Sequence, residues 1–149
     1  MKTKAINLNV TLPRIIAIDY GTKRTGLATT DPLKIIATAL DTVHSMDVIN
    51  FLKNYVENEP VEIFVVGMPT QLDGSDTNNT SLVKGFVKYL QKNFPEIPVH
   101  THDERFTSVM AMQAMIASGT SKKDRKVKGN IDKVSAVIIL QSYMEKMGI

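Results

Sequence analysis

The fold is decided by residues 14–20, Arg-Ile-Ile-Ala-Ile-Asp-Tyr, and by the glycine-bounded stretch that follows them, Gly-Thr-Lys-Arg-Thr-Gly at 21–26. A short β-branched run that ends in an acid and a glycine predicts a strand. The glycine-bounded stretch predicts a hairpin turn, with residues 26–30 as the returning strand. Asp19 is thereby expected at the end of an otherwise apolar strand.

The elements that follow predict the fold class. Residues 35–43 favour a third strand, and the nearly continuous apolar run at 62–67 is typical of a strand buried on both faces. Residues 99–103 favour a last short strand. Helices are expected after a Ser45 cap, from Thr80 or Ser81 to before Pro95, from Thr107 or Ser108 to Ser118, and over 131–147. This order predicts one α/β domain, a mixed five-stranded sheet with helices on both faces.

Composition excludes several classes of protein. The 149 residues correspond to one domain, and 43% hydrophobic with 22% charged residues is ordinary for a globular chain. The absence of cysteine excludes a disulfide framework, a thiolate zinc site and a cysteine nucleophile. No apolar run approaches the roughly 18 residues that would span a bilayer. Residues 1–13 form an N-terminal extension without the apolar core of a secretory signal, so we expect a cytoplasmic protein.

The positive charge is concentrated in one segment. The formal net charge is +3, but residues 119–129 alone carry +4 and the rest of the chain −1. The five bases of this segment are Lys122, Lys123, Arg125, Lys126 and Lys128. A local cationic patch of this kind is how proteins hold polyanions, and the flanking glycines predict a mobile basic loop. The alternative is a solvated loop that is basic only for solubility.

Acidic residues stand at the ends of three apolar elements. Asp19 ends the first strand, Asp103 and Glu104 end the last one, and Asp132 lies in the first turn of the final helix. Singly, each has a structural explanation in a turn, a cap or a helix N-terminus. Together they suggest oxygen ligands for Mg²⁺ or Mn²⁺, of which two ions can cleave a phosphodiester bond.

Two other patterns point less clearly to a site. His100 and His102 share one face of a strand, which fits strand-face packing, a surface position or, as the alternative, a zinc pair. Residues 21–26 resemble half of a phosphate loop, but Leu27 and Ala28 stand where that motif needs Lys and then Ser or Thr. The glycines are therefore expected to serve the hairpin, with Lys23 and Arg24 directed toward the site or solvent.

Four motifs resemble those of the YqgF family and span residues 15–141. They are DYGTKRTGLA at 19–28, VVGMP at 65–69 with Asp73-Gly74, DERFTS at 103–108, and the final helix with Lys128, Asp132, Ser135-Ala136 and IILQ at 138–141. The resemblance implies a ribonuclease H-like fold related to Holliday-junction resolvases. It also implies a cytoplasmic nuclease of bacterial type that matures the 5′ end of the small-subunit ribosomal RNA precursor, with Asp19, Glu104 and Asp132 as its acidic triad.

The leading hypothesis is a two-metal-ion nuclease in which Asp19 bridges Mg²⁺ or Mn²⁺ ions and Glu104 and Asp132 each complete one side. Arg105, with Lys23, Arg24 and the basic loop, would hold the phosphates of the nucleic acid. The alternative is a resolvase acting on branched DNA, for which a symmetric junction requires a dimer; a monomer or a homodimer is expected. A non-catalytic nucleic-acid-binding module and an actin-like ATPase domain remain as further alternatives.

Overall fold

The computed structural model describes the backbone of residues 12–69, 79–103 and 128–149, and the side chains of 12–69, 79–103 and 134–149. Its strands are β1 (Arg14–Tyr20), β2 (Arg24–Thr30), β3 (Ala37–His44), β4 (Val61–Met68) and β5 (Val99–Asp103). Its described helices are α1 (Val48–Asn58), α2 (Thr80–Asn93) and α5 (Lys128–Met147). Residues 1–11, the predicted helix from Thr107 or Ser108 to Ser118, and residues 119–127 of the basic loop lie outside the described residues.

The strands form one mixed sheet in the order β3-β2-β1-β4-β5. The first three strands are an antiparallel meander, in which Asp19 pairs with Gly26 and Arg24 with His44. Strand β4 lies parallel to β1, and β5 lies parallel to β4. The carboxyl ends of β1, β4 and β5 therefore meet at one edge of the sheet.

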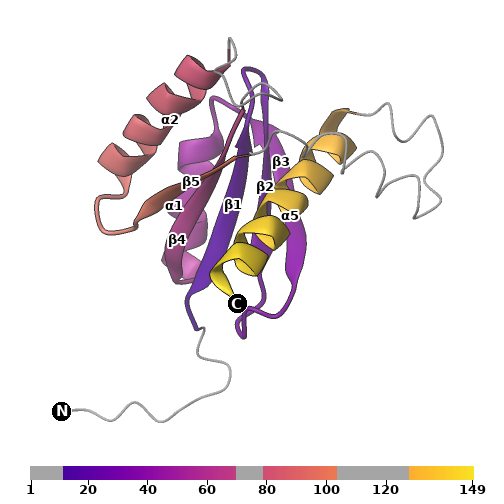
Figure 1. Cartoon of the computed structure of the whole chain (residues 1–149). Helices are drawn as coiled ribbons and strands as arrows, with labels where there is room; N and C mark the ends of the chain where they lie inside the picture. Colours follow the sequence, from indigo (N-terminus) through magenta and orange to yellow (C-terminus); the bar gives the residue numbers. More distant parts are fainter. Residues whose placement is uncertain (1–11, 70–78, 104–127) are drawn as a thin grey trace.

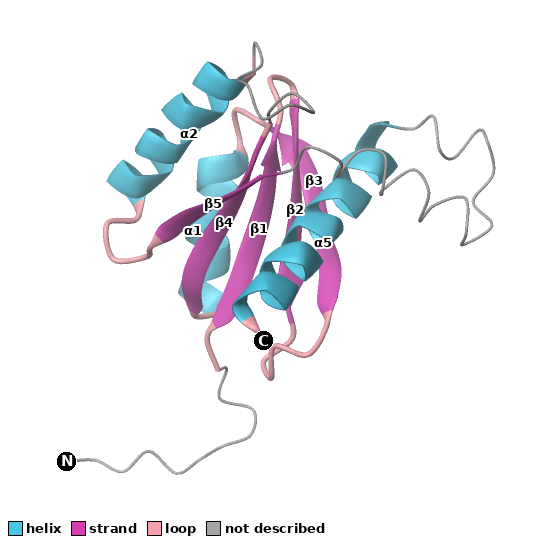
Figure 2. Cartoon of the chain, in the orientation of Figure 1, coloured by secondary structure: helices cyan, strands magenta, loops and turns pink. Residues whose placement is uncertain are grey.

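Helices cover both faces of the sheet, as Figures 1 and 2 show. On one face, Ile16 and Ile18 of β1 belong to a core that includes residues of α1 and α2. On the other face, Ile15 and Ala17 belong to a second core formed with α5. The alternation of β1 between two apolar cores explains why its sequence is a continuous apolar run. The predicted mixed five-stranded sheet with helices on both faces is confirmed.

The predicted start of β3 was wrong. The strand begins at Ala37, not at Ile35, because the Asp31 carboxylate accepts hydrogen bonds from the backbone N–H groups of Ile35 and Ile36 at 2.6 and 2.7 Å. These bonds hold the backbone in a turn, as aspartate commonly does. Both isoleucines are therefore left 71% and 58% exposed outside the sheet.

Two helix starts also differ from the prediction. Helix α1 begins at Val48 with Asp47 at its N-cap and no side-chain capping bond, so Ser45 is not the cap. The reason is that the Ser45 hydroxyl is used elsewhere, since it donates to the Gly21 carbonyl at 2.5 Å. Helix α5 begins at Lys128, before the first apolar residue Ile131, because backbone hydrogen bonds alone can form an initial polar turn. None of the described helices is long and apolar enough to cross a membrane.

Candidate active site

Asp19 lies at the carboxyl end of the central strand β1, and its side chain is partly buried. Successive strand residues face opposite sides of the sheet, so Asp19 shares the face of Ile15 and Ala17, which α5 covers. Its Cα is one residue beyond the Ile18–Val66 pair and is therefore next to β4 at Gly67. Asp19 is thus a partly buried carboxylate at the carboxyl end of the central strand.

The end of β5 reaches the same edge in parallel register. Gly67 pairs with His102, and Met68 with Asp103, which is the last residue of the strand. Val99 packs into the core beneath α1 and α2, so alternation places Asp103 on that face and His102 on the face of α5. Asp103 is thus on the opposite face from Asp19. Glu104 is the next residue along the chain and lies outside the described residues.

The third predicted acid belongs to α5. In Figure 1, α5 begins at the same end of the sheet at which β1 ends, and it crosses the face that carries Asp19. The backbone of Asp132 is in the N-terminal part of this helix, while its side chain is outside the described part of the chain. Of the three predicted acids, the structure therefore gives a side-chain position for Asp19 alone.

The predicted phosphate-binding residues divide in the same way. Lys23 is exposed in the turn after β1, and Arg24 begins β2 partly buried. Arg105, Lys122, Lys123, Arg125 and Lys126 lie outside the described residues, as does the side chain of Lys128. Lys23 thus lies in the turn between β1 and β2, at the same edge of the sheet as Asp19.

Ser45 holds this turn in place, a role that its sequence context did not reveal. Its hydroxyl donates to the Gly21 carbonyl and accepts from the Thr25 hydroxyl at 2.8 Å, while its backbone N–H donates to the Lys23 carbonyl at 3.0 Å. Hydrogen bonds from Ser45, in the segment before α1, therefore hold the turn that follows β1.

The two histidines of β5 contact α5 and are not part of a metal cluster among the described residues. His100 Nδ1 is hydrogen-bonded to the Tyr143 hydroxyl at 2.6 Å, and His102 Nε2 to the Ser142 hydroxyl at 2.8 Å. Among the side chains that the structure describes, no three potential metal ligands lie together. These contacts support strand-face packing against α5, one of the interpretations that the sequence left open.

Burial changes the titration of two groups in this contact. Burial, followed by the charge of Lys146, lowers the pKa of His102, while Asp103 acts in the opposite direction. Burial also raises the pKa of Tyr143, and the Glu62 carboxylate adds to the effect. Neutral His102 and neutral Tyr143 are thus favoured in the contact between α5 and β5.

Comparison with known proteins identifies the family of this chain. The family model described as "RuvX: Holliday junction resolvase" matches residues 13–146. A relative from Parabacteroides distasonis is 51% identical over 89% of this chain and 94% of its own, and one from Phocaeicola vulgatus is 52% identical over 90% and 96%. Both carry the name "Putative pre-16S rRNA nuclease".

A solved structure extends the likeness to the fold. RuvC of Thermus thermophilus in complex with a Holliday junction substrate superposes with a TM-score of 0.56 at 14% identity, covering 91% of this chain and 96% of RuvC. At this identity the likeness concerns the fold, and it confirms the predicted ribonuclease H-like architecture. The match over nearly the whole chain and the two relatives near 50% identity show the family. The chain belongs to the RuvX family, also called YqgF.

Proposed function

We propose that this chain is a metal-dependent nuclease that hydrolyses phosphodiester bonds and matures the 5′ end of the 16S ribosomal RNA precursor in the cytoplasm. The observation that carries the proposal is the position of Asp19. It ends the central strand at the edge where β4 and β5 also end, on the face covered by α5. The names of the relatives supply the substrate.

The donor chemistry at this edge fits a hard divalent cation. Asp19, Glu104 and Asp132 offer only carboxylate oxygens, and the chain has no cysteine, so Mg²⁺ or Mn²⁺ suits the set better than a thiophilic metal. When bound, a pair of such ions supplies an activated water and stabilises the leaving oxygen. Asp19, Glu104 and Asp132 would together hold the ions.

Lysine and arginine side chains of the protein would position the substrate. Lys23 and Arg24 follow Asp19 in the turn and at the start of β2, where they can neutralise phosphates beside the scissile bond. Arg105 and the basic segment with Lys122, Lys123, Arg125, Lys126 and Lys128 would add further phosphate contacts. The Ser45 hydrogen bonds keep the turn that carries Lys23 at a defined distance from Asp19.

The second candidate is resolution of branched DNA, favoured by the description of the family model and by the RuvC-like fold. Both activities would use the same acids, so the substrate distinguishes them. Cutting both strands of a symmetric junction would need a homodimer, whereas trimming an RNA end needs only a monomer.

The test is cleavage of labelled 16S precursor RNA, a four-way DNA junction and single-stranded controls, with Mg²⁺, Mn²⁺ or chelator. Asp19→Asn should abolish cleavage of whichever substrate the wild type cuts. Asp103→Asn is the matched control, since its carboxylate is at the same edge but on the opposite face, and it should remain active. Cleavage that survives both chelator and Asp19→Asn would refute the metal-dependent mechanism, and preferential cutting of the junction would replace the RNA substrate by DNA.

A further inference from the structure

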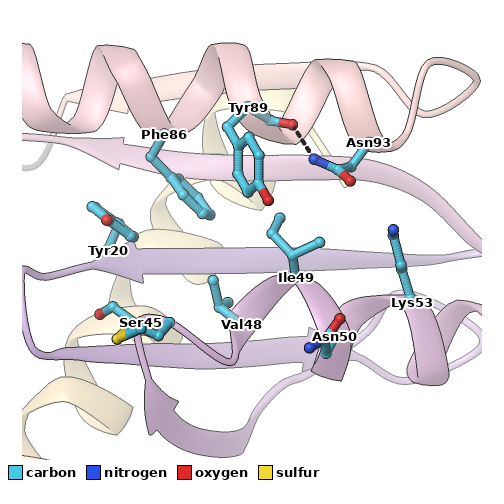
Figure 3. A pocket seen from close by; sticks show the side chains of 10 residues that line it. Tyr20, Ser45, Val48, Ile49, Asn50, Lys53, Phe86, Tyr89 and Asn93 are labelled. Atoms are coloured by element: carbon cyan, nitrogen blue, oxygen red, sulfur yellow. Dashed lines mark hydrogen bonds between the residues drawn. The ribbon is translucent and has the colours of Figure 1, made fainter.

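A groove lies on the opposite face of the sheet from Asp19, between α1 and α2 (Figure 3). Its volume is about 330 Å³, within the size range of small-molecule sites. We call it the α1–α2 groove; its lining residues are Tyr20, Ser45, Met46, Val48, Ile49, Asn50, Lys53, Phe86, Tyr89 and Asn93. Asp19 is not among them.

The walls of the groove are aromatic and amide in character. The rings of Tyr20 and Phe86 are stacked on each other with centroids 4.2 Å apart and planes within 12°, and Phe86 is buried, so this pair forms the apolar base of the groove. In Figure 3 the Tyr89 ring points across the groove toward Ile49 of α1, and 54% of this tyrosine is exposed. The amides of Asn50 and Asn93 add hydrogen-bond donors and acceptors. The exposed Tyr89 ring beside these amides suits a nucleobase, which stacks on aromatic rings and pairs through its polar edge.

The charge around the groove favours an anionic ligand. Within the part of the chain that the structure describes, Lys53 is the single charged residue of the lining. Helix α2 has no acidic residue and carries three exposed lysines at four-residue spacing, Lys84, Lys88 and Lys92. Lys92 is three residues from Tyr89, so the two are neighbours on the helix surface. Lysine side chains on either side of an exposed aromatic ring are typical of a binding surface for single-stranded nucleic acid.

One end of the groove adjoins the candidate active site, because Tyr20 lines it. Tyr20 directly follows Asp19, and because successive strand residues face opposite sides, one faces the groove and the other faces α5. In Figure 3 the groove extends from Tyr20 and Ser45 toward Lys53 and Asn93. A strand cut at Asp19 could therefore pass over the sheet edge and continue along α2.

We propose that the α1–α2 groove binds single-stranded RNA flanking the cleavage site, with a base against Tyr89 and phosphates on Lys53, Lys88 and Lys92. The proposal rests on the proposed nuclease function, whose substrate it defines as RNA with an unpaired flank.

The test is the binding of a fluorescent single-stranded RNA of mixed sequence, measured by anisotropy at several salt concentrations in the Asp19→Asn background. Tyr89→Leu should weaken binding about 5- to 150-fold, the range of base–aromatic stacking. Tyr89→Phe should restore it, because stacking needs the ring and not the hydroxyl. Lys88→Ser with Lys92→Ser should flatten the slope of log K against log salt by about 0.7 for each phosphate that the protein no longer neutralises.

A matched control and a mapping experiment complete the test. Lys146→Ser removes one lysine charge from an exposed position on α5, on the other face of the sheet, and should leave binding unchanged. RNA containing 4-thiouridine should crosslink to peptides of α1 and α2. Tyr89→Leu binding RNA as tightly as its parent would overturn the proposal. So would a Tyr89→Leu effect confined to self-association in sedimentation, because a second copy would then occupy the groove.

The proposed function and the groove can fail separately. Weaker binding by Tyr89→Leu, without cleavage by the wild type, would support the groove and refute the nuclease. Cleavage abolished by Asp19→Asn, with binding insensitive to Tyr89→Leu, would do the reverse.

Discussion

Gly21→Ala should destabilise the fold through one identified clash. A Cβ at Gly21 would lie 2.5 Å from the Arg24 carbonyl oxygen, where carbon and oxygen normally approach no closer than about 3.4 Å. That oxygen is a backbone atom and cannot rotate away. The Gly21 carbonyl is also held by Ser45, and Arg24 is paired with His44 on β3. The added methyl must therefore displace part of the hairpin.

The size of the effect follows from these constraints. Inserting a methyl group into packed surroundings costs about 1–3 kcal/mol. For a chain of this length, 1 kcal/mol corresponds to about 2–4 °C in the melting temperature, so Gly21→Ala should melt about 2–12 °C lower. Gly85→Ala is the matched control, because no atom lies within 4 Å of its new Cβ in α2. It should gain about 0.5–1 kcal/mol, since alanine loses less backbone entropy than glycine in a helix.

Urea unfolding followed by circular dichroism measures both variants, with the slope m checked for two-state behaviour. The two substitutions should shift the free energy of unfolding in opposite directions. Gly21→Ala should also reduce nuclease activity, because the turn that it distorts adjoins Asp19. A Gly21→Ala protein as stable as the wild type would refute the argument, and a destabilised Gly85→Ala protein would refute the account of α2.

Three further predictions concern stability. Thr30→Val should cost about 1–3 kcal/mol in urea unfolding, because it leaves the buried Ile15 N–H without its 3.1 Å acceptor, and a decrease under about 0.5 kcal/mol would contradict this. The lowered pKa of His102 means that the unfolded chain binds more protons, so stability should fall as pH drops below about 6.5, and His102→Gln should flatten this slope in urea titrations between about pH 5 and 7.5. Mg²⁺ at a hundredfold excess over its Kd should add about 2.7 kcal/mol to the wild type, seen as a higher melting temperature, whereas an equal gain in Asp19→Asn would exclude Asp19 as a ligand.

Much of the local structure could be predicted because it depends on neighbouring residues. The strand at 99–103 has the predicted bounds, and Asp19 was correctly expected at the end of an apolar strand. The start of β3 could not be predicted from its pattern. Ile35 and Ile36 are typical strand residues, but their backbone N–H groups donate hydrogen bonds to the Asp31 carboxylate. A side chain can compete with the neighbouring strand for backbone N–H groups, and hydrophobic periodicity does not reveal this competition.

The candidate site shows the same division. Its acids were predicted from the sequence, because carboxylates at the ends of apolar elements are unusual and need an explanation, and the family resemblance selected Glu104 over Asp103. The faces that Asp19 and Asp103 occupy depended on strand alternation and register. That register separates Asp103 from Asp19, which one-dimensional spacing could not do.

The sequence by itself determined the order of elements, the two-sided burial of β4 and the position of Asp19 at the end of β1, since each of these is a pattern within one short segment. The tertiary structure alone decided that Ser45 ties down the turn after Asp19 and that Tyr20 stacks on Phe86 to begin the α1–α2 groove. These contacts join residues 24 and 66 positions apart. They arise from how helices pack on the sheet, and many sequences with the same local pattern would place other residues there.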